Sequence, residues 1–339
     1  MSVARMSVAR ICCLFAVLFC LWPLTANAEE LKANRVGFVS AGSRDEAAAS
    51  LDALRKGLRD QGYEEGKNLE IEPKYAEGVP ERLPGLMDDL AKAKVSVIVT
   101  SSVASALAAK KAASSIPVVV VAASDFVGNG LASSLVHPGG NITGIDEDVP
   151  GLSTIRLELL KEAVRIKSPV AVLSAATGPT HEKLMADSER AAHALGVALK
   201  TFKIEDAQKT GEETGKEIDA AFDSIAKEQA TAILVFSGAL TDAHSKQIVE
   251  LATKYKLPGM YWQARFVEEG GLMYYGPDLP RVFEQSAFLV DRILKGASAG
   301  DLPVLYAKEF ELVINLKAAK ELGITIPQSI LSRANRVIQ

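Results

Sequence analysis

Apolar, β-branched runs alternate with helical patterns along most of this chain, most clearly between residues 95 and 125. Val95–Ser102 is one such run, Val103–Ser114 is a helical segment rich in Ala, Leu and Lys, and Ile116–Ala123 is a second apolar run. An apolar run of this length beside a helix predicts a parallel strand that is buried on both faces. Polar residues stand where the two predicted strands end, at Thr100, Ser101, Ser102, Ser124 and Asp125.

These polar strand ends are candidate ligand contacts. Ligands bind beyond the carboxyl ends of strands in open α/β sheets, and the free N–H groups at a helix N-terminus attract anions. We therefore expect Thr100–Ser102 to meet the anionic group of a ligand and Asp125 to pair with an ammonium or hydroxyl group. Helix capping by Ser or Thr is the structural alternative, and capping of the next turn is the alternative for Asp125.

The same strand–helix unit recurs before and after this stretch. Strands ending in a hydroxyl residue are predicted at Arg35–Ser40, Pro169–Ser174 and Thr231–Ser237. Their final residues extend the candidate ligand contacts to Ser40, Ser174 and Ser237, with capping again as the alternative. Tyr261 and Trp262 form a pair near a predicted strand end. They are either aromatic residues of the core or a face on which an aromatic or apolar ligand can stack.

The pattern restarts after the turn cluster at His137–Asn141, which indicates two domains of similar size. We place lobe 1 at residues 29–145 plus 273–302, and lobe 2 at residues 146–272 plus 303–339. The chain would then cross between the lobes three times. Two arrays joined by several crossings are typical of lobes that close on a ligand.

The N-terminal stretch has the pattern of a secretory signal peptide. Two arginines precede the apolar core Ile11–Leu21, and Ala26–Ala28 supplies a small-x-small cleavage site, so residues 1–28 are predicted to be removed. An uncleaved anchor is the alternative. Met1–Arg5 is repeated as Met6–Arg10, so translation from Met6 is equally compatible with this pattern. We expect a soluble periplasmic protein.

Composition and motifs narrow the chemistry. The chain has 339 residues, 48% hydrophobic and 24% charged, which is ordinary for a globular protein. Its net charge is −4, and losing Arg5 and Arg10 lowers this to −6, so no nucleic-acid footprint is indicated. All three cysteines lie in the predicted leader, and we find no phosphate loop, nucleophile elbow, metal-binding pair or dinucleotide fingerprint. We therefore expect no enzyme activity, cofactor or metal.

Several longer motifs resemble a family of ABC-transporter solute-binding proteins. They cover nearly the whole chain after the leader: Arg35–Ser40, Gly57–Asn68, Ala76–Pro84, His137–Gly144, Phe266–Asp278 and Phe310–Lys317. The resemblance implies a two-lobe periplasmic-binding-protein-like fold of type I. Each lobe would be a parallel sheet flanked by helices, with three hinge crossovers between the lobes.

The resemblance also implies a function. The family includes proteins that bind tryptophan and other aromatic amino acids, so the implied ligand is an amino acid or aromatic carboxylate held between the lobes. The implied partner is the ABC permease, and a monomer is expected. This chain departs from the family pattern at Ser174–Ala176 and Ser237–Ala239, where many relatives carry larger polar side chains, which would allow a different or bulkier solute.

Two other functions stay open at this stage. The same fold serves as a ligand-sensing module of a membrane receptor, and the genes beside this one would distinguish a permease partner from a kinase. A secreted α/β enzyme that uses Asp125 and a nearby hydroxyl would be revealed by turnover of its ligand that is lost on Asp125→Ala.

Overall fold

The computed structural model describes residues 33–166, 169–175, 179–205, 211–236 and 238–339, and Asn34–Gln339 form one compact unit. The predicted leader with its cysteines, and the candidate contact Ser237, lie outside the described residues. Within the part of the chain that is described, no helix is both long enough and apolar enough to cross a bilayer.

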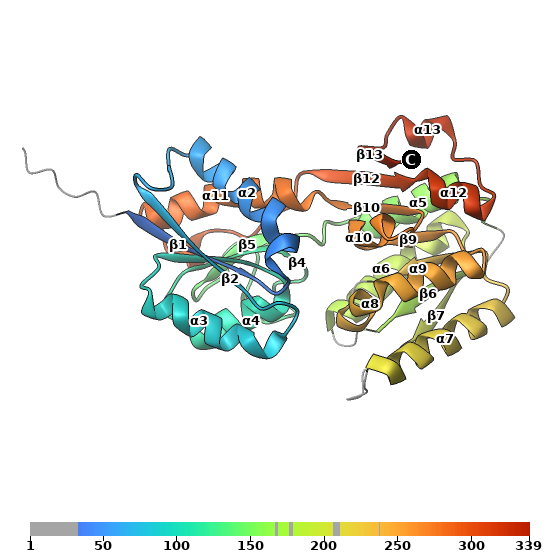
Figure 1. The fold of residues 1–339 in the computed structure, drawn as a ribbon, viewed down its shortest axis with the longest axis horizontal. Helices are drawn as coiled ribbons and strands as arrows, with labels where there is room; N and C mark the ends of the chain where they lie inside the picture. Colours follow the sequence, from blue (N-terminus) through green and yellow to red (C-terminus); the bar gives the residue numbers. More distant parts are fainter. Residues whose placement is uncertain (1–32, 167–168, 176–178, 206–210, 237) are drawn as a thin grey trace, which may run out of the picture. The chain divides into compact units, whose positions relative to one another are not determined.

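The first sheet, sheet A, is wholly parallel. Its strands are β1 (Asn34–Ser40), β2 (Leu69–Tyr75), β3 (Val97–Ser101), β4 (Val118–Ala123), β5 (Ile142–Asp146) and β11 (Leu305–Tyr306). They lie in the order β11-β5-β4-β3-β1-β2. The elements packed around it are α2 (Arg44–Asp60), η2 (Pro80–Arg82), α3 (Leu83–Lys92), α4 (Val103–Ala112), α11 (Leu279–Leu294) and η3 (Ala299–Asp301). Helices α2 and α11 cover one face, and α3 and α4 cover the other (Figure 1).

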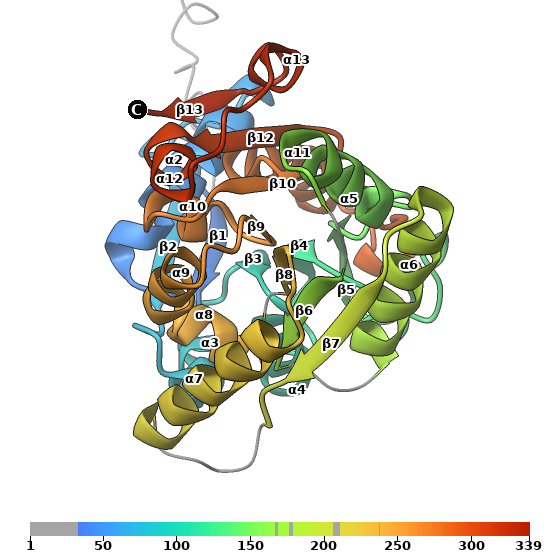
Figure 2. The ribbon, with the colours of Figure 1, turned by 90° about the vertical axis from the view of Figure 1, so that its right-hand side faces the viewer.

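The second sheet, sheet B, is built mainly from the later part of the chain. Its strands are β6 (Val170–Ser174), β7 (Leu199–Lys203), β8 (Ala232–Val235), β9 (Gly259–Tyr261), β10 (Met273–Pro277), β12 (Phe310–Asn315) and β13 (Arg336–Ile338). They lie in the order β13-β12-β10-β9-β8-β6-β7, and β12 runs antiparallel to β10. The remaining helices are α5 (Leu152–Ala163), α6 (Pro179–Leu195), α7 (Gly211–Lys227), α8 (Ala239–Ala243), α9 (Ser245–Lys254), α10 (Ala264–Glu268), α12 (Leu316–Leu322) and α13 (Gln328–Leu331). Figure 2 shows α5 and α6 on one side of β6 and β8, with α7 and α9 on the other.

The predicted fold class is confirmed, because sheet A is parallel, sheet B is mainly parallel, and both sheets are flanked by helices. The only antiparallel pairing among the described strands joins β10 to β12. The residue boundaries of the two lobes stay a prediction. The chain passes from one sheet to the other between β5 and β6, between β10 and β11, and between β11 and β12. Strand β10 therefore belongs to sheet B and β11 to sheet A.

Two stretches have a local structure that their own sequence does not indicate. The stretch Gly270–Pro277 contains strand β10, which is held between β9 and β12. Leu131–Leu135 has no helical turn. There the backbone amides of Leu131 and Ala132 both donate to the carbonyl of Phe126, which fixes an irregular loop instead.

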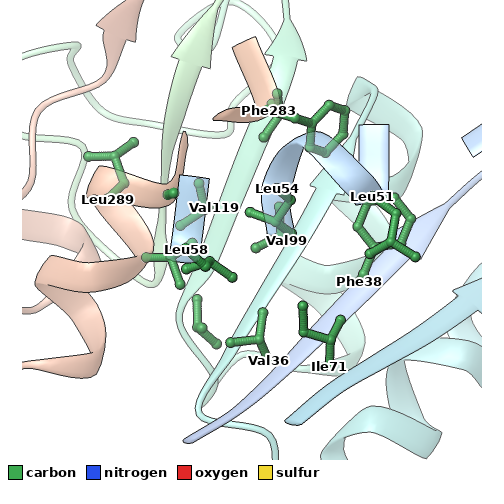
Figure 3. Packing of buried hydrophobic residues seen from close by; sticks show 14 of the residues in the cluster. Val36, Phe38, Leu51, Leu54, Leu58, Ile71, Val99, Val119, Phe283 and Leu289 are labelled. Carbon is green, nitrogen blue, oxygen red and sulfur yellow. The ribbon is translucent and has the colours of Figure 1, made fainter. Parts of the chain in front are cut away.

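Helix α11 completes the core of sheet A although it lies more than 200 residues after α2. Its Phe283 packs against Phe38 of β1, with the ring centroids 5.8 Å apart. Figure 3 shows Phe283 gathered with Leu51, Leu54 and Leu58 of α2 over the strands of sheet A. Burial of such side chains is the main favourable term in folding, at roughly 1.5–3 kcal/mol for each large apolar residue.

The contact between α2 and α11 depends on a glycine. A Cβ atom on Gly57 would lie 2.5 Å from the carbonyl oxygen of Glu284 and 2.8 Å from the Cβ of Ala287. Gly57→Ala is therefore expected to lower the free energy of unfolding by about 1–3 kcal/mol, as overpacked cores do, measured by urea unfolding.

The matched control for this prediction is Gly85→Ala in α3. A Cβ there would meet nothing within 4 Å, so alanine should leave stability unchanged or raise it by up to about 1 kcal/mol. Equal effects of the two substitutions would show that the crossing of α2 and α11 does not need the glycine.

Candidate functional site

The carboxyl ends of the parallel strands of sheet A meet at one edge, and most of the predicted residues of the first lobe lie there. Ser40 ends β1, Ser101 ends β3, and Ser124 and Asp125 follow β4 directly. Asp146, which was not among the predicted contacts, ends β5 at the same edge. The order of the strands places these residues in a row from β1 across β3 and β4 to β5.

Several of these hydroxyls are already engaged in local structure. Thr100 is fully buried and its Oγ1 donates to the carbonyl of Val39 at 2.9 Å. The Ser102 Oγ accepts from the Ser105 amide at 3.3 Å and caps α4. The Ser40 Oγ accepts from the Gly42 amide at 3.1 Å. Thr100 therefore contributes to the core of the sheet, whereas Ser101, Ser102 and Ser40 stay partly exposed at its edge.

Ser102 and Asp125 have backbones that non-glycine residues seldom adopt. Their φ angles are 75° and 49°, in the left-handed half of the map. Such conformations cost of order 1–3 kcal/mol and cluster where structure serves function. Asp125 is held by a bond from the Gly128 amide to Oδ1 at 2.9 Å, which is the turn-capping role that was its alternative.

Asp125 also takes part in hydrogen bonds between the elements around sheet A and α6 of the second lobe. The Thr180 Oγ1 donates to the Asp125 Oδ2 at 3.2 Å and accepts from the Asn129 Nδ2 at 2.9 Å. Asn129 also donates to the carbonyl of Ser124 at 2.8 Å. The loop that follows β4 therefore bonds directly to the first turn of α6.

The corresponding edge of sheet B is aromatic rather than hydroxyl-rich. Phe236 follows β8, and Trp262 follows β9, with their ring centroids 4.3 Å apart. Ser174 ends β6 in a buried position, and its Oγ lies 3.2 Å from the His181 Nδ1. Burial lowers the pKa of His181. His181 in turn meets the edge of Phe236 at 6.2 Å, so the predicted contact Ser174 is part of a buried polar pair next to these rings.

Tyr261 and Trp262 point to opposite faces of sheet B, as neighbours on a strand do. Tyr261 is 1% exposed and stacks on Phe266 at 5.1 Å. Burial raises its pKa well above the ordinary value. Of the two predicted aromatic contacts, Trp262 is thus the one that stays partly exposed at the strand ends.

Arg156 of α5 was missed by sequence reasoning. Its guanidinium lies 3.8 Å from the centre of the Trp262 ring, and its Nε donates to the carbonyl of Tyr275 at 2.7 Å. The residue is 2% exposed, and burial lowers its pKa to about 10. A signal was present: Leu152, Arg156 and Leu159 lie on the same buried stripe of α5, and an arginine on an apolar stripe needs a reason to be there.

Acidic side chains surround this cation. Burial raises the pKa of Glu147 to about 7, the Arg156 charge opposes this rise, and Asp146, Asp148 and Asp242 add to it. Burial also raises the pKa of Asp146 to about 6. Asp148 forms an ion pair with Lys183. Among the described residues, no group of three or more His, Cys, Asp or Glu has a metal-binding arrangement.

The raised pKa of Glu147 predicts a pH-dependent stability. Because the folded state holds this proton more tightly than the unfolded chain, stability is highest below pH 4.5 and falls as the pH rises toward about 7, by up to about 3 kcal/mol. Urea unfolding between about pH 5 and about pH 8 measures this. Glu147→Gln should flatten the decline, and an unchanged slope in that variant would refute the assignment.

Two surface hollows lie away from these edges. One of about 500 Å³ is lined by residues of α12, α13 and the loop between them. Another of about 360 Å³ lies beside Lys110 and Gly130–Ser133. None of the predicted contacts lines either hollow, so both are separate from the strand-end site.

The comparison with known families is decisive for the kind of protein. The profile of the family described as ABC transporter substrate binding protein matches residues 34–338, which is nearly the whole described chain. This chain belongs to that family. The substrate-binding protein thus has the family membership that its motifs indicated.

Individual relatives agree. A curated protein named tyrosine-binding protein, from Clostridioides difficile, is 28% identical over 279 residues, covering 81% of this chain and 78% of that protein. A solved structure of a conserved domain protein from Vibrio cholerae is 29% identical with a TM-score of 0.76, covering 90% of this chain and 100% of the other. A Streptococcus ABC domain in complex with L-Trp shares the fold, with a TM-score of 0.78 at 24% identity, over 91% and 100% of the two chains.

Proposed function

We propose that this substrate-binding protein captures an aromatic amino acid between two lobes and delivers it to an ABC permease. The observation that carries the proposal is the partly exposed Trp262 ring at the end of β9, which packs against the buried Phe236 ring and lies against the Arg156 guanidinium. Aromatic faces bind a flat ring by offset or edge contacts. The relatives named for tyrosine and solved with L-Trp support the same ligand class.

The proposed site joins the two strand-end edges. Ser40, Ser101, Ser102, Ser124 and Asp125 would contribute from the first lobe, and Trp262 from the second, with Ser174 acting through His181. The hydrogen bonds of Thr180 to Asp125 and Asn129 support this arrangement, because they tie the loop after β4 to α6. Lobe closure on the ligand would create the surface that the permease recognises.

The proposal includes a soluble, monomeric, periplasmic protein without enzymatic activity, cofactor or metal. The leader pattern at residues 1–28 supports the location. The engagement of Asp125 with Gly128 and Thr180 argues for a structural role at the site rather than a catalytic base.

The test is a calorimetric and thermal-shift screen of the purified protein. The panel contains L-tyrosine, L-tryptophan and L-phenylalanine, with L-leucine, L-glutamate and D-glucose as controls. Saturable binding of an aromatic member, with a raised Tm, is the expected result. Binding of the sugar or of L-glutamate in preference to every aromatic member would refute the ligand class.

A further inference from the structure

Arg156 is a buried cation whose donors are only partly used. A guanidinium has five N–H donors, and Nε donates to the Tyr275 carbonyl at 2.7 Å. Among the described residues, none accepts a hydrogen bond from its other donors, and none of their acids forms an ion pair with it within 4.0 Å. The side chain is 2% exposed. A buried charge without an ion-pair partner is costly to a protein unless something else neutralises it.

The surroundings of Arg156 orient the guanidinium and cover most of its surface. Its Cζ lies over the Trp262 ring, 3.8 Å from the ring centre, and the Trp262 ring packs against Phe236. Tyr275 stacks on Phe310 at 5.8 Å on the neighbouring strands. A cation over an indole face in a desolvated place is stabilised by the ring. Apolar walls also strengthen any charge-assisted hydrogen bond made there.

The position is the edge of sheet B where a ligand would enter. Trp262 follows β9, and Tyr275 follows the two residues of β10 that pair in parallel with β9, so both lie at the carboxyl end of this parallel pair. The unused Nη atoms thus belong to a group at the ligand-binding edge of an α/β sheet. Arg265 differs from Arg156, because its Nε forms an ion pair with Glu269 at the surface.

We infer that the Arg156 guanidinium, held by Tyr275 and seated on Trp262, is the carboxylate subsite of this binding protein. The planar guanidinium takes the two oxygens of a carboxylate side by side. The negative charge of Asp148 near it favours a ligand that also carries an ammonium group over a simple anion. The inference rests on the proposed function and revises one part of it: the anionic group of the ligand meets Arg156, not Thr100–Ser102.

The first arm of the test compares ligands on the unaltered protein by calorimetry. L-Tyrosine and L-tryptophan are measured against tyramine and tryptamine, which lack only the carboxylate. The amines should bind about 100-fold more weakly, because they leave Arg156 buried without an anion. Equal affinity of the amine and the amino acid would overturn the inference, and this arm needs no substitution.

The second arm uses Arg156→Gln and Arg156→Lys, with Arg165→Gln as the control that removes an exposed arginine. Arg156→Gln should lose about 100-fold in affinity for L-tyrosine, and its preference for L-tyrosine over tyramine should disappear. The affinity of Arg156→Lys for L-tyrosine should lie between those of the unaltered protein and Arg156→Gln, since lysine keeps the charge but not the planar guanidinium with its paired N–H donors. Arg165→Gln should match the unaltered protein. A retained preference in a folded Arg156→Gln variant would refute the subsite.

The two proposals fail in different ways. If aromatic amino acids bind with no dependence on Arg156, the subsite is wrong and the proposed function stands. If another carboxylate-bearing solute binds instead and Arg156→Gln abolishes its binding, the ligand class is wrong and the subsite stands. If no carboxylate binds, both are wrong.

Discussion

Replacing Trp262 with alanine is expected to weaken the binding of L-tyrosine or L-tryptophan by about 100-fold or more. Two contacts are lost together: the tilted packing of the Trp262 ring against Phe236, and the contact of its face with the Arg156 guanidinium. Central aromatic contacts of this kind cost about 2 kcal/mol or more when truncated. Calorimetric titration of the folded variant gives the affinity directly.

The controls for this prediction separate the ring from its size. Trp262→Phe keeps an aromatic face and should retain most of the affinity. Phe288→Ala removes an aromatic ring that is 50% exposed on α11, a helix that packs on sheet A rather than on sheet B, and should leave binding unchanged. Wild-type affinity in a folded Trp262→Ala variant would remove the aromatic edge of sheet B from the site.

Replacing Phe283 with alanine is expected to lower the free energy of unfolding by about 3–5 kcal/mol, the cost of emptying a buried phenylalanine site. Phe283 is 1% exposed and lies against Phe38, in the cluster that α2 and α11 form over sheet A (Figure 3). The neighbouring helices cannot collapse into the space without separating from the strands beneath them. Urea unfolding gives the change.

A matched control lies on the same helix. Phe288→Ala deletes the same side chain where half of it faces solvent, so its effect should stay well below that of Phe283→Ala. If both substitutions cost the same, packing between α11 and sheet A does not hold the first lobe together.

The elements of sheet A were predictable because short continuous stretches of the sequence indicate which of their residues are buried. The apolar residues of β3 and β4 are almost all buried, as an uninterrupted β-branched run predicts. The capping box of Ser43 and Glu46 likewise marks the start of α2 locally. The strand β10 was not predictable in this way, because its partner β12 lies more than thirty residues further on and its own five residues include a glycine and a proline.

The site was predictable only in outline. Strand ends could be located, and the hydroxyls at Ser40, Ser101 and Ser124 do lie at one edge of sheet A. The direction of each side chain could not be read from the sequence: Thr100 and Tyr261, both predicted as ligand contacts, have side chains that are buried in the core. Arg156 depends on Trp262 and Tyr275, which are more than a hundred residues away and are brought to it only by the fold.

The contact between α2 and α11 also decides the order in which this protein becomes stable during its synthesis. Residues 34–146 hold nearly all of sheet A, yet the helix that closes its core is finished only at Leu294. A growing chain that has not reached this point leaves the inner face of α2 and the strands below it uncovered. The core of the amino-terminal half is therefore complete only once the carboxyl-terminal third of the chain has been made.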